Sequence, residues 1–165
     1  MKQAKAEDFK SIIELYSACR VFLNTRGVDQ WVHGYPTSEI VRNDIEQKDL
    51  WLVRIEDELA AAIVVNKSAA KRYNELSWEC KGQDHLEVHR LAVHPKYMNQ
   101  GLGRSVMMWA ENEAKNRGAC CIRLDTYSMN EDNIRFYKNL EFRSTGNELF
   151  WPPLESSFLC FEKLV

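Results

Sequence analysis

The chain has 165 residues, 22 basic and 24 acidic side chains, and a formal net charge of −2. This length suits one domain with a substantial core, and the nearly balanced charge argues against nucleic acid or an anionic membrane as partner. No apolar run approaches the roughly 20 residues of a membrane helix, and the charged start of the chain predicts no signal peptide.

The first part of the chain predicts an edge strand followed by two helices. Residues 2–5 suit a short strand. Apolar residues then recur every three or four positions over residues 9–23, which predicts an amphipathic helix. After an aromatic-rich loop, Thr37 or Ser38 is a plausible N-cap for a second helix that reaches about Gln47.

The middle of the chain predicts strands. Two apolar runs, 50–55 and 59–65, lie on either side of a short acidic turn and predict a β-hairpin. The polar segment 67–82 follows, with a helical turn expected at 69–74. An apolar-rich strand is then predicted over residues 86–93.

The last part predicts a strand–helix–strand unit and a final pair of strands. Two strands that flank one helix should be parallel, with a right-handed crossover. The predicted elements form an α/β fold: a mixed, mostly antiparallel central sheet with one parallel βαβ pair and helices on both faces. The elements predicted here are a helix at 101–117, a strand at 120–125, a helix from Asn130 to about 140, and strands at 143–149 and 157–164.

Cysteine usage predicts a reduced chain. The number of cysteines is odd and no C-x-x-C spacing occurs, so we expect neither a disulfide framework nor a zinc site, and we predict a cytoplasmic protein without a metal. The five are Cys19, Cys80, Cys120, Cys121 and Cys160.

A glycine turn joins the strand at 86–93 to the following helix. Gly101 and Gly103 allow an anion to approach the backbone closely, and the N-terminus of a helix favours negative charge. The sequence is neither a P-loop nor the dinucleotide motif G-x-G-x-x-G. On spacing alone, a tight structural turn explains the two glycines better than a phosphate site does.

Two further groups of residues could carry chemistry. Asn130, Asn133 and Tyr137 are spaced for one helix face, near the carboxyl end of a parallel strand, where ligands bind in such folds. Glu87 and His89 are two apart on one strand, so they share a face, and either could accept a proton. The alternatives are a helix cap with a packed tyrosine, and a solvated strand face.

Two segments together resemble the GNAT superfamily of N-acetyltransferases. They are LEVHRLAVHPKYMNQGLGRSVMMW and IRLDTYSMNEDNIRFYKNLEF. They match a strand ending in (L/V)-A-V-x-P, then (R/Q)-x-x-G-x-(G/A), then N-x-x-A-x-x-(F/L)-Y-x-x-x-G-F. The stretches QW-x-x-x-YP and RLDTYS-x-N resemble one bacterial-type subgroup. The resemblance covers nearly the whole chain and implies a single N-acetyltransferase domain over residues 1–165.

The resemblance implies an acetyl-CoA site. The strand backbone would pair with the pantetheine arm, the glycine loop would bind the pyrophosphate, and two asparagines would hold the arm near the thioester. The residues implied are Leu91, Ala92, Val93, Asn99, Gln100, Gly101, Gly103, Arg104, Ser105, Asn130 and Asn133.

The resemblance also implies catalytic roles for Tyr137, as the acid that protonates the departing thiolate, and for Glu87, as the base. The chemistry is coherent, because an amine attacks a thioester only when it is neutral and a thiolate leaves better with a proton donor. A backbone N–H at Val93 would stabilise the oxyanion. His89 or a water remains an alternative base.

The acceptor is expected to be a small-molecule amine, because aromatic faces suit a cation. The residues expected to bind it are Trp31, Tyr35, Trp78 and His89. An aromatic core is the alternative for the aromatic residues. An acetyltransferase acting on a protein amine, and a CoA-binding sensor without turnover, are the alternative functions. A homodimer is compatible with this interpretation.

The sequence departs from the family pattern at four positions. Met98 and Asn99 replace the usual Arg/Gln and Gly, Asn133 stands where Ala is usual, and Glu141 stands where Gly is usual. The pyrophosphate contacts are mainly backbone N–H groups, so the site depends on Asn99 adopting the required loop conformation.

Overall fold

The computed structural model describes residues 1–31, 34–67, 73, 75–81, 84–152 and 154–165. These residues form two compact units, and each is described by itself. Unit 1 comprises Met1–Val65 and His89–Trp109, and unit 2 comprises Asn66–Val88 and Ala110–Val165. The helical turn predicted at 69–74 falls largely outside the described residues.

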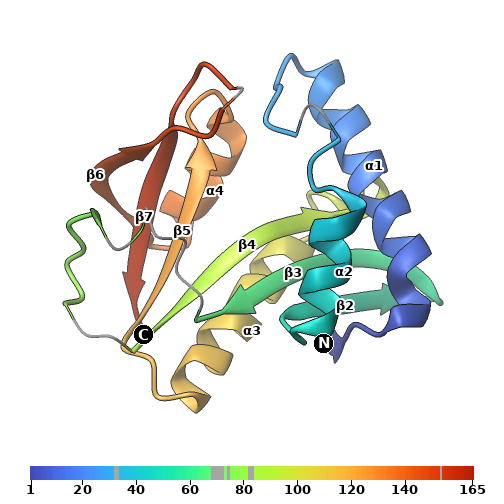
Figure 1. Cartoon of the computed structure of the whole chain (residues 1–165), viewed down its shortest axis with the longest axis horizontal. Helices are drawn as coiled ribbons and strands as arrows, with labels where there is room; N and C mark the ends of the chain where they lie inside the picture. The colour runs from blue at the N-terminus through green and yellow to red at the C-terminus, as the bar shows by residue number, and fades with distance from the viewer. Residues whose placement is uncertain (32–33, 68–72, 74, 82–83, 153) are drawn as a thin grey trace. The chain divides into compact units, whose positions relative to one another are not determined.

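The strands hydrogen-bond in the order β1-β2-β3-β4-β5-β7-β6 (Figure 1). β4 and β5 pair in parallel, and the other pairs whose register is described are antiparallel. The predicted mixed sheet with one parallel pair is therefore confirmed. The strands are β1 (Lys2–Gln3), β2 (Leu50–Ile55), β3 (Glu58–Asn66), β4 (His85–Val93), β5 (Cys121–Tyr127), β6 (Arg143–Leu149) and β7 (Phe158–Leu164).

The helices also lie close to their predicted positions. Thr37 caps α2, since its side chain accepts a hydrogen bond from the Ile40 N–H. Two short 3₁₀ helices were not predicted, because three residues leave no periodic pattern. The helices are α1 (Phe9–Thr25), α2 (Ser38–Glu46), α3 (Leu102–Asn116) and α4 (Glu131–Asn139), with η1 (Ala6–Asp8) and η3 (Pro95–Tyr97). Among the described residues, no helix combines the length and apolar character needed to cross a membrane.

The core of unit 1 lies between α1, α2 and the β2–β3 hairpin. Ile12, Leu15, Tyr16 and Cys19 form the buried stripe of α1, as its three-four spacing predicts. They pack in one cluster with apolar side chains of α2, β2 and β3. This burial, rather than helix propensity alone, stabilises α1 and fixes what its inner face can contact.

In unit 2, β5 and β7 pair along their whole length, from Cys121 opposite Leu164 to Tyr127 opposite Phe158. The parallel pairing of β4 with β5 covers three residue pairs, from His85 opposite Cys121 to Glu87 opposite Arg123.

One feature contradicts the expected fully reduced chain: Cys80 and Cys120 form a disulfide. Sequence spacing could not reveal it, because the two residues are 40 positions apart.

Candidate functional site

A buried ion pair holds the second half of β4 in unit 1. Arg90 has a left-handed backbone, with φ +50°, which costs a residue with a Cβ about 1–2 kcal/mol. Its Nε and Nη2 donate to the two carboxylate oxygens of Asp44 at 2.8 and 2.7 Å. The Arg90 and Asp44 side chains are only 14% and 5% exposed. This two-point contact fixes the backbone just before residues 91–93.

The predicted cofactor strand is also held from α1. The Cys19 thiol donates to the Val93 carbonyl at 3.3 Å, and the Tyr16 hydroxyl donates to the Arg90 carbonyl at 3.4 Å. Ala92 is buried, whereas Leu91, Val93 and His89 are partly buried. The β4 backbone is therefore fixed on the side of α1.

The loop after β4 contains two left-handed residues, Asn99 with φ +60° and Gly101 with φ +82°. Asparagine is one of the few side chains that adopts this conformation readily, so Asn99 meets the requirement that the sequence raised. A Cβ at Gly101 would meet nothing within 4 Å, so its backbone angle rather than crowding favours glycine. Left-handed residues beside right-handed ones turn successive N–H groups toward one concave surface.

The other predicted residues of this loop lie at the start of α3. Gln100 donates from Nε2 to the Lys96 carbonyl at 2.9 Å. Ser105 donates from its N–H and its hydroxyl to the Gly101 carbonyl, at 3.0 and 3.3 Å. Gly103 and Arg104 belong to the first turn of α3. The loop thus leads directly into a helix N-terminus, where backbone N–H groups favour an anion.

Two predicted acceptor residues in unit 1 have structural contacts. Trp31 is buried in the core and packs edge-on against Tyr16, with ring centroids 5.6 Å apart. Tyr35 accepts a hydrogen bond from Arg90 Nη1 at 3.2 Å. These contacts agree with the aromatic-core alternative for Trp31, and they make Tyr35 part of the network around Arg90.

In unit 2, Glu87 is fully buried and its Oε1 lies 3.2 Å from Nε2 of His85. The two residues are two apart on β4, so they share one face of the strand. His85 is itself only 8% exposed. Each of these two groups can carry a proton, which distinguishes this pair from a carboxylate bound by arginine.

Asn130, Asn133 and Tyr137 lie at the start and along one side of α4. Asn130 is the N-cap, because its Oδ1 accepts from the Asn133 N–H at 3.1 Å. Asn133 Nδ2 donates to the Thr126 hydroxyl at 3.4 Å. Tyr137 packs against Phe142 and Phe161. Burial, with a smaller contribution from the charge of Asp125, raises the pKa of Tyr137 above its usual value near 10.

Trp78, which is partly buried, belongs to a network of side chains that includes residues of β5 and β7. Its ring stacks on the Arg123 guanidinium, 4.6 Å from Cζ to the ring centroid, and its Nε1 donates to the Tyr73 carbonyl at 2.8 Å. Arg123 Nε donates to Glu162 Oε1 at 3.0 Å. The hydroxyl of Tyr73 bonds the Asp125 carboxylate. Trp78 is therefore held by a cation, Arg123, and by the backbone of Tyr73, five residues before it.

The comparisons with known proteins agree with this arrangement of elements. The model of the acetyltransferase (GNAT) family matches residues 9–142. The chain belongs to the acetyltransferase (GNAT) family.

Individual relatives extend this result beyond the matched segment. The chain is 28% identical over 160 residues to the uncharacterized N-acetyltransferase YesJ of Bacillus subtilis (strain 168). The aligned region covers 95% of this chain and 85% of YesJ. It resembles the GNAT acetyltransferase structure from Streptococcus agalactiae 2603, with a TM-score of 0.84, 21% identity, and 99% and 94% of the two chains covered. It also resembles yncA from Salmonella typhimurium, solved with its cofactor acetyl-CoA, with a TM-score of 0.70, 16% identity, and 99% and 91% covered.

The structure explains two departures of this GNAT chain from the family pattern. Asn99 and Glu141 replace usual glycines, and both have positive φ, +60° and +66°. The backbone therefore keeps the conformation that glycine would supply, although Glu141 does so against the preference of its side chain.

Sequence analysis missed three residues beside the predicted ones. Asp44 and Arg90 escaped notice because they are 46 positions apart and only the fold brings them together. His85 carried a weaker signal, because it lies just before the strand predicted at 86–93; the observed strand begins one residue earlier, which places His85 on the same face as Glu87.

Proposed function

We propose that this GNAT acetyltransferase is one domain over residues 1–165 that uses acetyl-CoA to acetylate the amine of a small molecule. The observation that carries the proposal is the loop from Asn99 to Ser105, whose two left-handed residues precede the N-terminus of α3. Such a backbone presents N–H groups to an anion without a basic side chain. The pyrophosphate of CoA is an anion that suits it, and the relative from Salmonella typhimurium was solved with acetyl-CoA.

The remaining donor contacts are proposed as follows. The β4 backbone at Leu91–Val93 pairs with the amides of the pantetheine arm, and Asn130 and Asn133 bind the arm near the thioester. The two hydrogen bonds from Arg90 to Asp44 support the proposed role of Leu91–Val93, because they fix the β4 backbone before the ligand binds. Preorganised backbone groups lose less entropy on binding than flexible ones do.

The proposed chemistry is direct attack of the neutral amine on the thioester carbonyl. Glu87, directly or through a water, takes the proton that the amine loses. His85, whose Nε2 contacts Glu87, is a second group that can accept that proton. Tyr137 donates a proton to the departing thiolate. Its raised pKa keeps the phenol protonated through the range in which the amine reacts.

The acceptor is proposed to be a cationic or partly apolar small amine. Trp78 remains a proposed contributor: Arg123 occupies one face of its ring, and the other face would suit an alkylammonium group. His89 and Tyr35 remain proposed contributors. Trp31 is proposed to act indirectly, because it belongs to the apolar core against which Tyr35 packs.

The test is thiol release from acetyl-CoA with a panel of polyamines, amino acids and aromatic amines, run beside peptides with free N-termini and lysines. Tyr137→Phe should lower kcat by about 10²-fold or more with little change in acetyl-CoA affinity. The matched control is Tyr127→Phe, another buried tyrosine of unit 2. Thermal protection by acetyl-CoA with no acetylation of any amine would support a binding module instead, and acetylation of peptides alone would overturn the small-molecule acceptor.

A further inference from the structure

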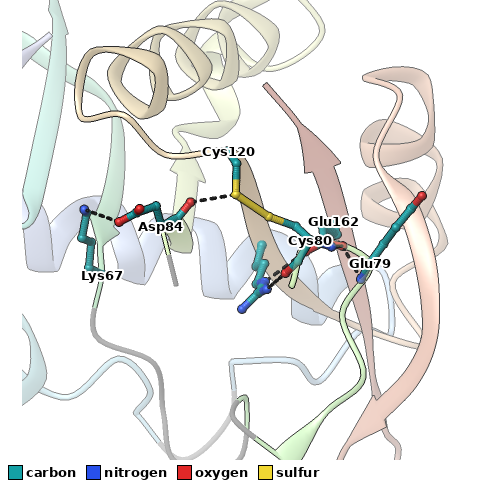
Figure 2. The surroundings of a disulfide bond; sticks show 7 residues. Lys67, Glu79, Cys80, Asp84, Cys120 and Glu162 are labelled. Carbon is teal, nitrogen blue, oxygen red and sulfur yellow. Dashed lines mark hydrogen bonds and ion pairs between the residues drawn. A yellow bond between two sulfur atoms is a disulfide. The ribbon is translucent and has the colours of Figure 1, made fainter. Parts of the chain in front are cut away.

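Three cysteine sulfurs gather at the start of β5 in unit 2. Cys80 lies in the segment before β4, Cys120 directly precedes β5, and Cys121 is its first residue. Their Sγ atoms all lie within 4.8 Å of one another. Cys80 and Cys120 form the disulfide drawn in Figure 2, whereas Cys121 is fully buried and lies outside it.

The disulfide by itself does not account for Cys121. A disulfide uses two sulfurs, and the third sulfur beside them brings the number to three, which is the number of protein ligands in a zinc site that keeps one position for water. Sulfurs bound to one tetrahedral ion at about 2.3 Å lie roughly 3.8 Å from each other. Once the disulfide is reduced, sulfur movements of about 1 Å would let one ion contact all three.

The backbone around the three cysteines is held independently of the disulfide. The Cys80 N–H donates to Glu162 Oε2 at 3.1 Å, and its carbonyl accepts from Arg123 Nη2 at 2.5 Å. The Cys120 N–H donates to the Asp84 carbonyl at 2.7 Å. Cys121 pairs with β4 and β7 on its two sides. Reduction would therefore leave three thiols close together on a fixed frame.

Charge and access also suit a soft cation. Cys120 is exposed, so an ion and a water can reach the cluster, while Cys80 and Cys121 are buried. Three thiolates this close together repel one another and need a nearby positive charge. A divalent ion that binds all three sulfurs supplies that charge and displaces their protons.

We propose that the reduced protein binds one thiophilic d¹⁰ cation of the Zn²⁺ class through Cys80, Cys120 and Cys121, with a water as the fourth ligand on the exposed side. A cellular dithiol gives two electrons and two protons to the Cys80–Cys120 disulfide and becomes a disulfide itself. The ion then replaces three thiol protons, which pass to solvent. In the reduced state the ion links β5 to the segment that contains Trp78, as the disulfide does in the oxidised state.

The experiment titrates the full-length chain, reduced with a phosphine and freed of metal, with Co²⁺ under nitrogen. One Co²⁺ per chain should bind and give thiolate-to-cobalt charge-transfer absorption, and Zn²⁺ should displace it. Cys121→Ser should weaken binding by about tenfold or more. Cys160→Ser, at another buried cysteine outside both the disulfide and the cluster, should bind as the parent does.

Several results would overturn the proposal. They are the lack of a charge-transfer band, and unchanged affinity in Cys121→Ser. A third is a disulfide that survives phosphine treatment, which thiol alkylation would detect. If Cys121→Ser does not fold by circular dichroism, Cys120→Ser provides the test, because its side chain is exposed and its loss leaves the core intact. That variant must lose the band too, since a band that survives in it excludes the three-sulfur site.

Discussion

The buried pair between Arg90 and Asp44 should be the most sensitive contact of unit 1 outside its apolar core. Asp44→Asn removes the charge but keeps the shape, and it leaves a guanidinium that is only 14% exposed without its carboxylate. Loss of one partner of a buried pair typically costs about 3–5 kcal/mol. For a chain of this length, about 3 °C of Tm is lost for each kcal/mol, so Tm should fall by roughly 10 °C or more.

A double-mutant cycle separates the pair from the cost of burying either group alone. Arg90→Met with Asp44→Leu should be less destabilised than the sum of the two single variants, with a coupling of about 2 kcal/mol or more. Arg90→Lys keeps a charge but loses the two-point contact, and should fall between the parent and Asp44→Asn. Urea denaturation provides the free energies. A loss below about 1 kcal/mol in Asp44→Asn would refute the view that this pair fixes β4.

Three further predictions address other parts of the chain. Glu141→Gly should stabilise the protein by about 0.5–1 kcal/mol in urea denaturation, because glycine accepts the φ of +66°. The relief of backbone strain exceeds the cost of the more flexible unfolded chain. Glu141→Ala, which keeps the strain, should not stabilise the protein. Because burial raises the pKa of Tyr137, its phenol stays protonated as pH rises, so kcat should not fall between about pH 8 and 10; an alkaline loss of kcat that disappears in Tyr137→Phe would contradict this. Gly101→Val should raise the KM for acetyl-CoA far more than it lowers kcat, because a β-branched residue resists a φ of +82°, whereas an unchanged KM would remove the loop from the donor site.

Local patterns in the sequence were enough to predict most elements. The three-four spacing of α1 and the two apolar runs of the β2–β3 hairpin each depend on residues close in sequence, and they lie where they were expected. Of the two N-cap candidates for α2, Thr37 or Ser38, the structure shows Thr37, and Asn130 caps α4 as predicted. Backbone angles were less accessible: nothing near Arg90 predicts a left-handed residue inside a strand, because the partner that stabilises it is Asp44, far away in the chain.

The missed long-range contacts follow once the strand order is known. A charged residue within an apolar strand is buried only with a partner. Of the two charged residues in each of β5 and β7, one is buried, Arg123 and Glu162 respectively. Antiparallel pairing places these two directly opposite each other. Each strand alone therefore indicated that a partner exists, and only the topology could identify it.

The two buried glutamates of unit 2, Glu87 and Glu162, differ in the donors that bind them. Arg123 lies between them in the sheet, opposite Glu87 on β4 and Glu162 on β7. Its Nε bonds Glu162, whose other oxygen accepts two backbone N–H groups. Both oxygens of Glu162 are thus already engaged by three donors, which leaves little room for the proton of an amine. Glu87 instead contacts His85, which can itself take up or release a proton, and this difference favours Glu87 as the base in the proposed reaction.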